Sequence, residues 1–346
     1  MEQTVASTST TASPATSAVA PGGAPVAELA PLLAEPVRIA LPELGCVRVE
    51  GADAANFLQS QLTADVVQQS ADELSLSGYC TAKGRLIATF HQWRDGDAVM
   101  LQLPHEMLAA VAKRLAMFVL RSKVKIIDDS AQRTALAVAG PGAAGVLRAA
   151  GLAVGDTAWS SVAAGGLRAS RLPPGPRCAE RFLLTMRADE PLPAALDALR
   201  ALPPAAWWWS EIDAAVPTVF AATQEKFVPQ MINFEVLGGV NFRKGCYPGQ
   251  EIVARSQYLG KLKRRMQRAH AAQAIPPAPG ADVFHSTQAE PVGTVVMAAS
   301  APEGGVDLLF EAPVDRLASG TLHLQAQDGE PLMVLPLPYE LTDPTA

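Results

Sequence analysis

The residues with the greatest potential for chemistry lie in one short segment, 243–251, which reads RKGCYPGQE. Cys246 stands there between the cationic pair Arg243 and Lys244 and a proline, Pro248, which suits the first turn of a helix because its missing N–H group needs no partner there. Neighbouring cations and a helix N-terminus both favour a thiolate over a thiol. The pattern therefore predicts a reactive or ligating thiol at Cys246. A buried and inert cysteine is the alternative, because free cysteines are usually buried.

The residues after Cys246 have the pattern of a short helix. We predict it over residues 248–259, ended by Gly260. Glu251 lies in its first turn and has Arg255 four residues later, a spacing that stabilises a helix. This helix would place its N-terminus just after the thiol.

Composition and charge exclude several classes of protein. The 346 residues are 49% hydrophobic and carry a formal net charge of −6, which indicates two or three domains with substantial cores and argues against a wholly basic nucleic-acid-binding protein. No apolar run predicts a transmembrane helix, and the N-terminus lacks a secretory pattern. The four cysteines form no CxxC pair and no Cys/His cluster with metal-binding spacing. We therefore expect no metal site made by the chain alone, and a reducing, cytoplasmic compartment.

Changes in composition and in hydrophobic pattern divide the chain into three parts. Residues 1–35 are rich in Ala, Pro, Ser and Thr with almost no charge, which predicts a disordered tail and order from about Pro36. Residues 36–265 have mixed α+β patterning that indicates two α+β units, whose sequences can be interleaved. Residues 266–346 have the short alternating segments of an antiparallel β-barrel.

The first α+β unit is predicted to be ferredoxin-like or related. Its strands are expected at residues 47–50, 74–80, 85–93, 98–103 and 123–127, and its helices after Asp53 and over 107–119. In the second unit we expect strands at 134–139, 167–171 and 181–186 and helices at 142–150 and 192–202. The barrel strands are expected at 293–298, 306–310, 321–326 and 331–337.

Two further patterns leave alternatives open. Residues 140–145 match GxGxxG between a predicted strand and a helix, but a proline fills the second position and no acidic residue follows at the usual distance, so a tight turn is favoured over dinucleotide binding. The run KLKRRMQR at 261–268 holds five cations in an acidic chain. It predicts either an anion-binding face or a solvated strand edge.

Three consecutive tryptophans, 207–209, form the most unusual aromatic cluster. In a strand they would alternate between faces, and one face could stack on a flat heteroaromatic ligand. Asp213 has the same strand parity as Trp207 and Trp209, so it would share their face. A carboxylate beside an aromatic platform suits a pterin, whose ring presents a row of N–H donors. Packing into a core is the commoner outcome for such residues.

The segment 244–251, KGCYPGQE, resembles the signature of the YgfZ family, folate-binding proteins linked to iron–sulfur cluster maintenance and tRNA modification. The similarity covers about residues 40–341. It includes segments at 57–65, 82–85 (AKGR), 179–183 (AERFL), 227–230 (FVPQ) and 336–341 (PLPYEL).

The resemblance implies the fold of the glycine cleavage T-protein, with two α+β units and a C-terminal barrel around a central folate channel. It implies tetrahydrofolate or a derivative as ligand, and Cys246 as the functional thiol with Lys244 beside it. The remaining motif residues are Gly245, Tyr247, Gly249, Gln250 and Glu251. The folate-binding set we expect is Asp213, Trp207, Leu44 and Arg255, with Leu44 replacing a tryptophan that some relatives carry.

The same resemblance bears on whether the chain is an enzyme. T-proteins need an aspartate after the early hairpin, but here Ala88 and Thr89 occupy that position. A positioned acid or base contributes about 10²–10⁴ in rate, so classical aminomethyl transfer is not expected. We expect instead a folate-binding accessory protein that supports iron–sulfur cluster assembly or repair and, through it, tRNA modification. One cysteine cannot complete a stable cluster site, so any iron–sulfur cluster would be transient and shared with a client or assembly protein.

Two alternatives remain. A folate-dependent one-carbon transferase or demethylase would need a substitute base, for which Asp213 and Glu251 are the candidates. Direct tRNA binding through residues 261–268 would show strong salt dependence.

Overall fold

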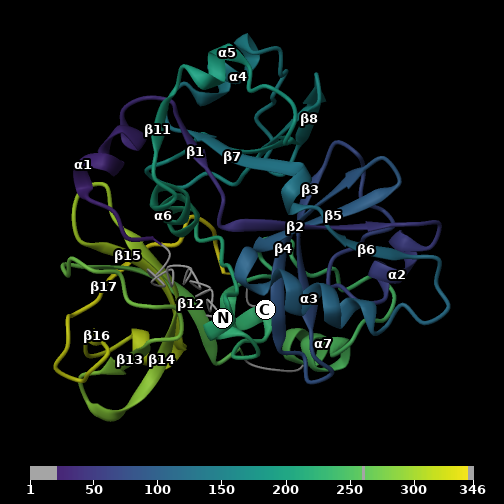
Figure 1. Ribbon diagram of the computed structural model, residues 1–346. Helices are drawn as coiled ribbons and strands as arrows, with labels where there is room; N and C mark the ends of the chain where they lie inside the picture. Colours follow the sequence, from purple (N-terminus) through teal and green to yellow (C-terminus); the bar gives the residue numbers. More distant parts are fainter. Residues whose placement is uncertain (1–21, 259–261, 342–346) are drawn as a thin grey trace, which may run out of the picture.

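The computed structural model of the chain describes residues 22–258 and 262–341. Within these residues the backbone forms three β-sheets with helices between and around them (Figure 1). No helix of the described part is long and apolar enough to cross a membrane. The architecture is α+β, as expected from the sequence.

Sheet 1 is antiparallel throughout, with strand order β3-β4-β5-β2-β6. Its strands are β2 (Leu44–Glu50), β3 (Leu74–Cys80), β4 (Leu86–Asp95), β5 (Ala98–Pro104) and β6 (Lys125–Asp128). Helix α2 (Ala54–Gln59) follows β2, and α3 (His105–Ala116) packs on the sheet. The five strands are one more than a βαββαβ unit has, so sheet 1 is related to the predicted ferredoxin-like form and not identical to it.

Sheet 2 has the order β11-β1-β7-β10-β9-β8. Its strands are β1 (Val37–Ala40), β7 (Arg133–Ala139), β8 (Ser161–Ala164), β9 (Leu167–Arg171), β10 (Arg181–Arg187) and β11 (Arg200–Leu202). Strand β1 precedes sheet 1 in the chain but pairs with β7 and β11, so the two units share the sequence in an interleaved way. The helix expected over 192–202 is wrong in its second half: α5 covers only Ala194–Asp197, and β11 pairs in parallel with β1.

The GxGxxG segment lies in sheet 2 as a tight turn between β7 and α4 (Ala143–Ala149). Gly140 has a φ of 97°, and a Cβ there would lie 2.3 Å from the carbonyl oxygen of Glu35. The backbone N–H of Ala144 donates to Glu180 Oε2 at 2.7 Å. A carboxylate of the chain itself thus occupies the place where a phosphate would bind, and the turn is structural.

Sheet 3 has the order β16-β13-β14-β15-β12-β17. Its strands are β12 (Arg264–Ala271), β13 (Asp282–His285), β14 (Gln288–Ser300), β15 (Val306–Pro313), β16 (Leu322–Leu324) and β17 (Met333–Leu335). The sheet curls (Figure 1). One antiparallel bridge pairs His323 of the edge strand β16 with Pro331, two residues before the other edge strand, β17. Two backbone hydrogen bonds, from Leu324 N–H to the Glu330 carbonyl and from Leu332 N–H to the Leu322 carbonyl, flank this bridge. The described residues form a curled, half-barrel sheet, and the predicted closed barrel and folate channel stay predictions.

The expected disorder over residues 1–35 is wrong for its described part. Helix α1 (Val26–Leu29) and the 3-10 helix η1 (Ala30–Leu33) lie there, and Leu29 and Leu32 are fully buried. The N–H of Ala24 donates to Ser300 Oγ in sheet 3 at 3.1 Å. The two leucines belong to the main core cluster and tie the segment to it, although the segment is too short to show a helical period. Residues 1–21 lie outside the described part.

The three tryptophans lie on a helix, α6 (Ala205–Asp213), and not on the predicted strand. Two prolines, Pro203 and Pro204, precede the helix, a common arrangement at helix starts. Every residue of α6 is buried. The helix packs on β14 and β15 and belongs to a single core cluster that takes residues from all three sheets, among them Val47, Ile39 and Met266. Helix α6 thus connects the three units.

The remaining elements are short. They are the 3-10 helices η2 (Ser130–Gln132), η3 (Ala221–Thr223), η4 (Pro229–Ile232) and η5 (Val314–Leu317), and the helix α7 (Gln250–Tyr258).

Candidate functional site

Lys244 anchors the loop that carries Cys246. Its ammonium Nζ donates to the carbonyl oxygens of Gln59 and Leu62, both at 2.6 Å, and of Ala64 at 3.0 Å. These carbonyls lie at and just after the C-terminus of α2, where helices leave acceptors without intrahelical partners. Burial lowers the pKa of Lys244 to about 8, against the opposing effect of the Asp65 carboxylate. At neutral pH the side chain is therefore mainly charged, and all three of its donors are used.

Thr63 fixes the start of the same loop. Its hydroxyl donates to the carbonyl of Gly239 at 2.5 Å and accepts from the N–H of Gly78 in β3 at 2.7 Å. Its own carbonyl accepts from the N–H of Asn241 at 2.9 Å. One buried threonine thereby joins α2, β3 and the loop.

The hairpin turn between β3 and β4 packs on the C-terminal end of the loop that carries Cys246. Gly249 has a φ of +79°, and a Cβ there would lie 2.4 Å from the Thr81 carbonyl oxygen and 2.5 Å from the Gly84 backbone nitrogen. A Cβ on Gly84 would lie 3.1 Å from the Cβ of Ile252 in α7. The two glycines are required because two backbones touch here.

The segment 227–230 completes the arrangement. The carbonyl of Phe227 accepts from the N–H of Leu86 in β4 at 2.8 Å. The buried amide of Gln230 donates to the carbonyl of Val253 in α7 at 2.8 Å. Four segments that are far apart in the sequence, 59–65, 82–86, 227–230 and 244–253, therefore meet around one loop.

Cys246 is the exposed member of this arrangement. The other three cysteines, Cys46, Cys80 and Cys178, are buried, and burial raises their pKa values to about 12, 12 and 11. On either side of Cys246 the chain is held: Lys244 is buried, and its Nζ lies 5.3 Å from the centre of the buried Tyr247 ring. The two anchors hold the intervening thiol at the surface.

The electrostatic activation predicted for this thiol has little geometric support. Helix α7 begins at Gln250, four residues after Cys246, so the thiol lies outside its first turn. The ammonium of Lys244 is bound to carbonyl groups of the preceding units. The structure provides accessibility for the thiol, with the exposed Arg243 three positions before it.

The surface next to the thiol is basic and partly apolar. Ile252 and Tyr258 of α7 are 42% and 59% exposed. Tyr258 also packs on Phe242, with the ring centres 5.7 Å apart. The exposed charged residues in the four segments around the loop, or within two residues of them, are Lys83, Arg85, Lys226, Arg243 and Arg255, together with Glu225 and Glu251. We call this surface, with Cys246, the thiol face.

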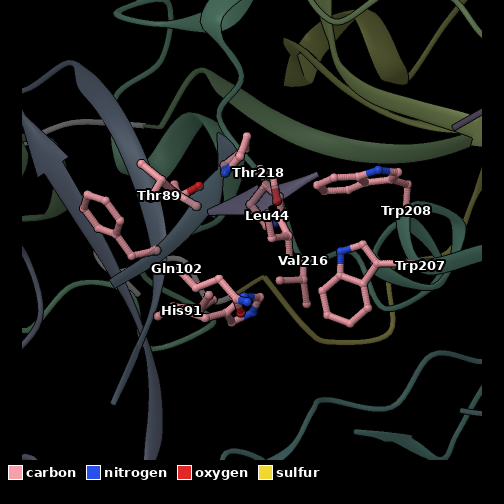
Figure 2. Close-up of a pocket in the computed structure, with 13 residues that line it drawn as sticks. Leu44, Thr89, His91, Gln102, Trp207, Trp208, Val216 and Thr218 are labelled. Carbon is pink, nitrogen blue, oxygen red and sulfur yellow. The ribbon is translucent and has the colours of Figure 1, made fainter. Parts of the chain in front are cut away.

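Two of the four predicted folate-binding residues are brought together, and the other two are not. Leu44 and Trp207 line one cavity, with Thr89, one of the two residues at the position of the expected aspartate, also on its wall (Figure 2). Its volume is about 20 Å³, enough for one water molecule but not for a pteridine ring. Arg255 is exposed on α7 and does not line this cavity. A folate would fit here only if side chains such as Leu44 moved.

Asp213 lies in an ion-pair network, away from Trp207. Its Oδ1 accepts from Arg177 Nε at 3.2 Å and Arg268 Nη2 at 3.1 Å, and its Oδ2 accepts from the backbone N–H groups of Arg177 and Cys178, both at 2.9 Å. Asp213 is fully buried. Each carboxylate oxygen already has two donors, so the predicted pterin contact would have to displace one of them.

Trp209, and not Trp207, belongs to the same network. Its indole N–H donates to Asp307 Oδ2 at 2.7 Å, and its ring lies 4.7 Å from the Arg177 guanidinium carbon. Asp307 is also bound by Arg177 and lies 2.8 Å from His270 Nδ1. The network joins sheet 2, α6 and sheet 3. The predicted common face of Trp207, Trp209 and Asp213 is wrong for Trp207. On a helix, residues four apart share a face, so Trp209 and Asp213 lie together and Trp207 does not.

The basic run is neither of the two predicted surfaces. Strand β12 lies between β15 and β17, and three of its arginines are paired with carboxylates. The pairs are Arg264–Glu311, Arg265–Glu235 and Arg268–Asp213. Lys263 is exposed, and Lys261 lies outside the described residues.

Two polar residues of the cavity, His91 on β4 and Gln102 on β5, were not predicted from the sequence. Both lie within strands that are otherwise largely apolar, and that position is the signal that could have marked them. The described residues contain no group of three or more His, Cys, Asp or Glu side chains that could hold a metal ion.

Comparison with known proteins shows the fold. No family model matches the chain. The structure is similar to the glycine cleavage system aminomethyltransferase T from Bartonella henselae, with a TM-score of 0.72 over 91% of this chain and 90% of that one, at 16% identity. Heterotetrameric sarcosine oxidase from Corynebacterium sp. U-96 matches 47% of this chain and 83% of its own, with a TM-score of 0.33 and 15% identity, too weak to bear on the fold. The chain has the fold of the aminomethyltransferase T.

Proposed function

We propose that the chain is a folate-binding accessory protein that supports iron–sulfur cluster assembly or repair, and through it tRNA modification, with Cys246 as its functional thiol. The observation that carries the proposal is the meeting of four distant segments around the loop that exposes Cys246. Each of the four includes or adjoins a motif by which the chain resembles the YgfZ family. A fold that holds one thiol at its surface with this many long-range contacts is consistent with a role for that thiol.

The proposed partner surface is the thiol face. An iron–sulfur cluster needs several thiolate ligands, and Cys246 is the one exposed cysteine of the chain. A client or assembly protein would therefore supply the other ligands. The exposed Ile252 and Tyr258 offer apolar contact area, and the surrounding cations favour an acidic partner surface.

The folate part of the proposal is supported by the fold and by the family resemblance. Leu44 and Trp207 line the same cavity, and its wall includes Thr89, one of the two residues, Ala88 and Thr89, where the resemblance places an aspartate. Because the cavity is too small for a pteridine ring as it stands, folate binding requires it to widen. We expect calorimetric titration with tetrahydrofolate to show saturable binding that Trp207→Phe weakens.

The thiol part is tested separately. Cys246→Ser should fail to restore the activities of iron–sulfur enzymes in a strain from which the gene is deleted, while Cys178→Ser, at a buried cysteine, should restore them. Folate titration of the same variants separates the two parts. Full restoration by Cys246→Ser would overturn the role of the thiol, and absence of binding to any reduced folate would overturn the role of the ligand.

A one-carbon transferase is the second candidate, favoured by the fold of the aminomethyltransferase T. Its two candidate bases are poorly placed: Asp213 is bound by two arginines, and Glu251 is exposed on α7. Turnover of a methylamine donor with tetrahydrofolate would favour this candidate over the accessory role.

A further inference from the structure

The cavity beside α6 has an unusual wall. Three of its side chains, His91, Gln102 and Trp207, each carry a buried polar atom that has no hydrogen-bond partner in the protein: His91 Nε2, Gln102 Oε1 and Trp207 Nε1. The three residues are 9%, 3% and 2% exposed. A buried polar atom without a partner costs about 1–3 kcal/mol, so three around one cavity call for a ligand.

These atoms come from separate elements that converge on the cavity. His91 and Gln102 are directly opposite each other in the antiparallel pair β4–β5. Trp207 lies on α6, with its ring 6.1 Å from the His91 ring in an edge arrangement. In Figure 2 the polar ends of His91 and Gln102 lie close together, and the indole nitrogen of Trp207 is on the side of its ring that faces Leu44 and Val216. The strand register and the buried helix fix all three positions.

We infer that this cavity is a binding site for a single water molecule, held by His91, Gln102 and Trp207. The volume of about 20 Å³ exceeds the 10–15 Å³ that one water molecule needs and is far below that of a pocket for an organic ligand. The Trp207 indole only donates, and the Gln102 oxygen only accepts. A water molecule accepts the first bond, donates the second, and forms the third with His91 in either tautomer of the neutral imidazole.

The charge of the surroundings selects a neutral ligand. Burial, together with the nearby Arg181 guanidinium, lowers the pKa of His91 to about 3, so its ring is neutral at physiological pH. Arg181 also lies 5.9 Å from the centre of the Trp207 ring and is itself fully buried. Arg181 is itself paired with the buried Glu211 carboxylate, so the surroundings supply no free charge to balance an ion. An ammonium or metal ion would also meet the Trp207 N–H donor, from which it cannot accept a hydrogen bond, whereas water can.

This site does not depend on the proposed function. It is tested first by a crystal structure of the full chain at a resolution that shows ordered water. We expect one density peak within hydrogen-bond distance, about 2.7–3.2 Å, of His91 Nε2, Gln102 Oε1 and Trp207 Nε1. A dry cavity, a peak with the contacts of a cation, or a direct bond between two of the three side chains would overturn the inference.

A solution measurement completes the test. In proton–nitrogen spectra, the indole resonance of Trp207 should show magnetisation transfer from a long-lived water molecule. Gln102→Met, which removes one acceptor at similar length, should reduce that transfer and shift the indole proton upfield. Leu103→Met changes the same cavity wall without a polar atom and should leave the transfer intact. Equal spectra for Gln102→Met and the unaltered protein would contradict the assignment.

Discussion

Arg268 Nη2 lies 3.1 Å from Asp213 Oδ1, and both side chains are buried between α6 and sheet 3. The contact gives Asp213 a role in stability that is independent of any role in ligand binding. A loss of ligand binding after Asp213→Ala would therefore not identify a ligand contact, since the substitution removes the carboxylate that pairs with Arg268 and one of the carboxylates that bind Arg177. Variants that test folate binding have to be compared at equal stability.

Asp213→Asn should lower the free energy of unfolding by about 3–5 kcal/mol, because removing one partner of a buried ion pair leaves the other charge uncompensated. Urea denaturation followed by tryptophan fluorescence measures the change. Asp189→Asn, at an exposed carboxylate paired with the exposed Arg187, is the matched control and should change stability far less than Asp213→Asn. Equal effects of the two substitutions would refute the structural role of Asp213.

Lys244→Met should cost about 2–4 kcal/mol of stability, since three carbonyl groups at the end of α2 lose their common donor. Lys244→Arg should rescue little of it, because a planar guanidinium cannot direct three donors as an ammonium does. Lys83→Met, at an exposed lysine of the thiol face, provides the control. Denaturation midpoints of the three variants measure these effects. A Lys244→Met variant as stable as Lys83→Met would contradict the stabilising role of the Lys244 hydrogen bonds.

Gly249→Ala should destabilise the chain by at least about 1–3 kcal/mol, because its φ of +79° disfavours a side chain and the new Cβ would meet the Thr81 carbonyl oxygen at 2.4 Å. Gly245, in the same loop, has no atom within 4 Å of the position of a Cβ. Gly245→Ala should therefore be nearly neutral. Thermal unfolding of the two variants tests this difference. Equal losses of stability would show that the whole loop is sensitive to substitution and that Gly249 has no special requirement for glycine.

One of the four thiols should react rapidly with an aromatic disulfide reagent in the folded protein, and the other three only after unfolding, because Cys46, Cys80 and Cys178 are buried. The rapid phase should disappear in Cys246→Ser and persist in Cys178→Ser. A rapid phase that survives Cys246→Ser would show that another cysteine is accessible.

His91 should make the protein sensitive to acid. Its pKa is about 3 in the folded chain and 6.5 without the fold. Between these values the unfolded chain binds a proton that the folded chain does not, so stability is present above pH 6.5 and falls as pH decreases toward 3, by about 1.4 kcal/mol per pH unit. Between pH 7 and 5 the loss is about 2 kcal/mol. His91→Gln should lack this component, and identical pH profiles of the two proteins would argue against a buried neutral imidazole.

Much of the fold could be predicted from local patterns. Strand β3 covers Leu74–Cys80 and β9 covers Leu167–Arg171, the same bounds as the predicted strands, because each run is bounded by turn residues. Helix α6 could not be predicted in this way. All of its residues are buried, so it has no polar face and no helical period, and three tryptophans in a row favour strand propensity instead.

The candidate site could be predicted from the sequence only in part. A thiol of interest at Cys246 could be inferred from its neighbours, but the partners of Lys244 and Asp213 could not. Arg268 is 55 residues from Asp213, and such ion pairs depend on the packing of separate units. The same applies to the arginines of β12, whose charges suggested a surface until their buried carboxylates were placed beside them.

The anchoring of Lys244 has a consequence for the order of folding. Its three acceptors lie 180 to 185 residues earlier in the chain, so closing these contacts costs the entropy of a very long loop. During synthesis the loop that carries Cys246 emerges only after both sheet 1 and sheet 2. The thiol can reach its final position only on a surface that is already complete, and a chain that stops short of this step presents a mobile cysteine in its place.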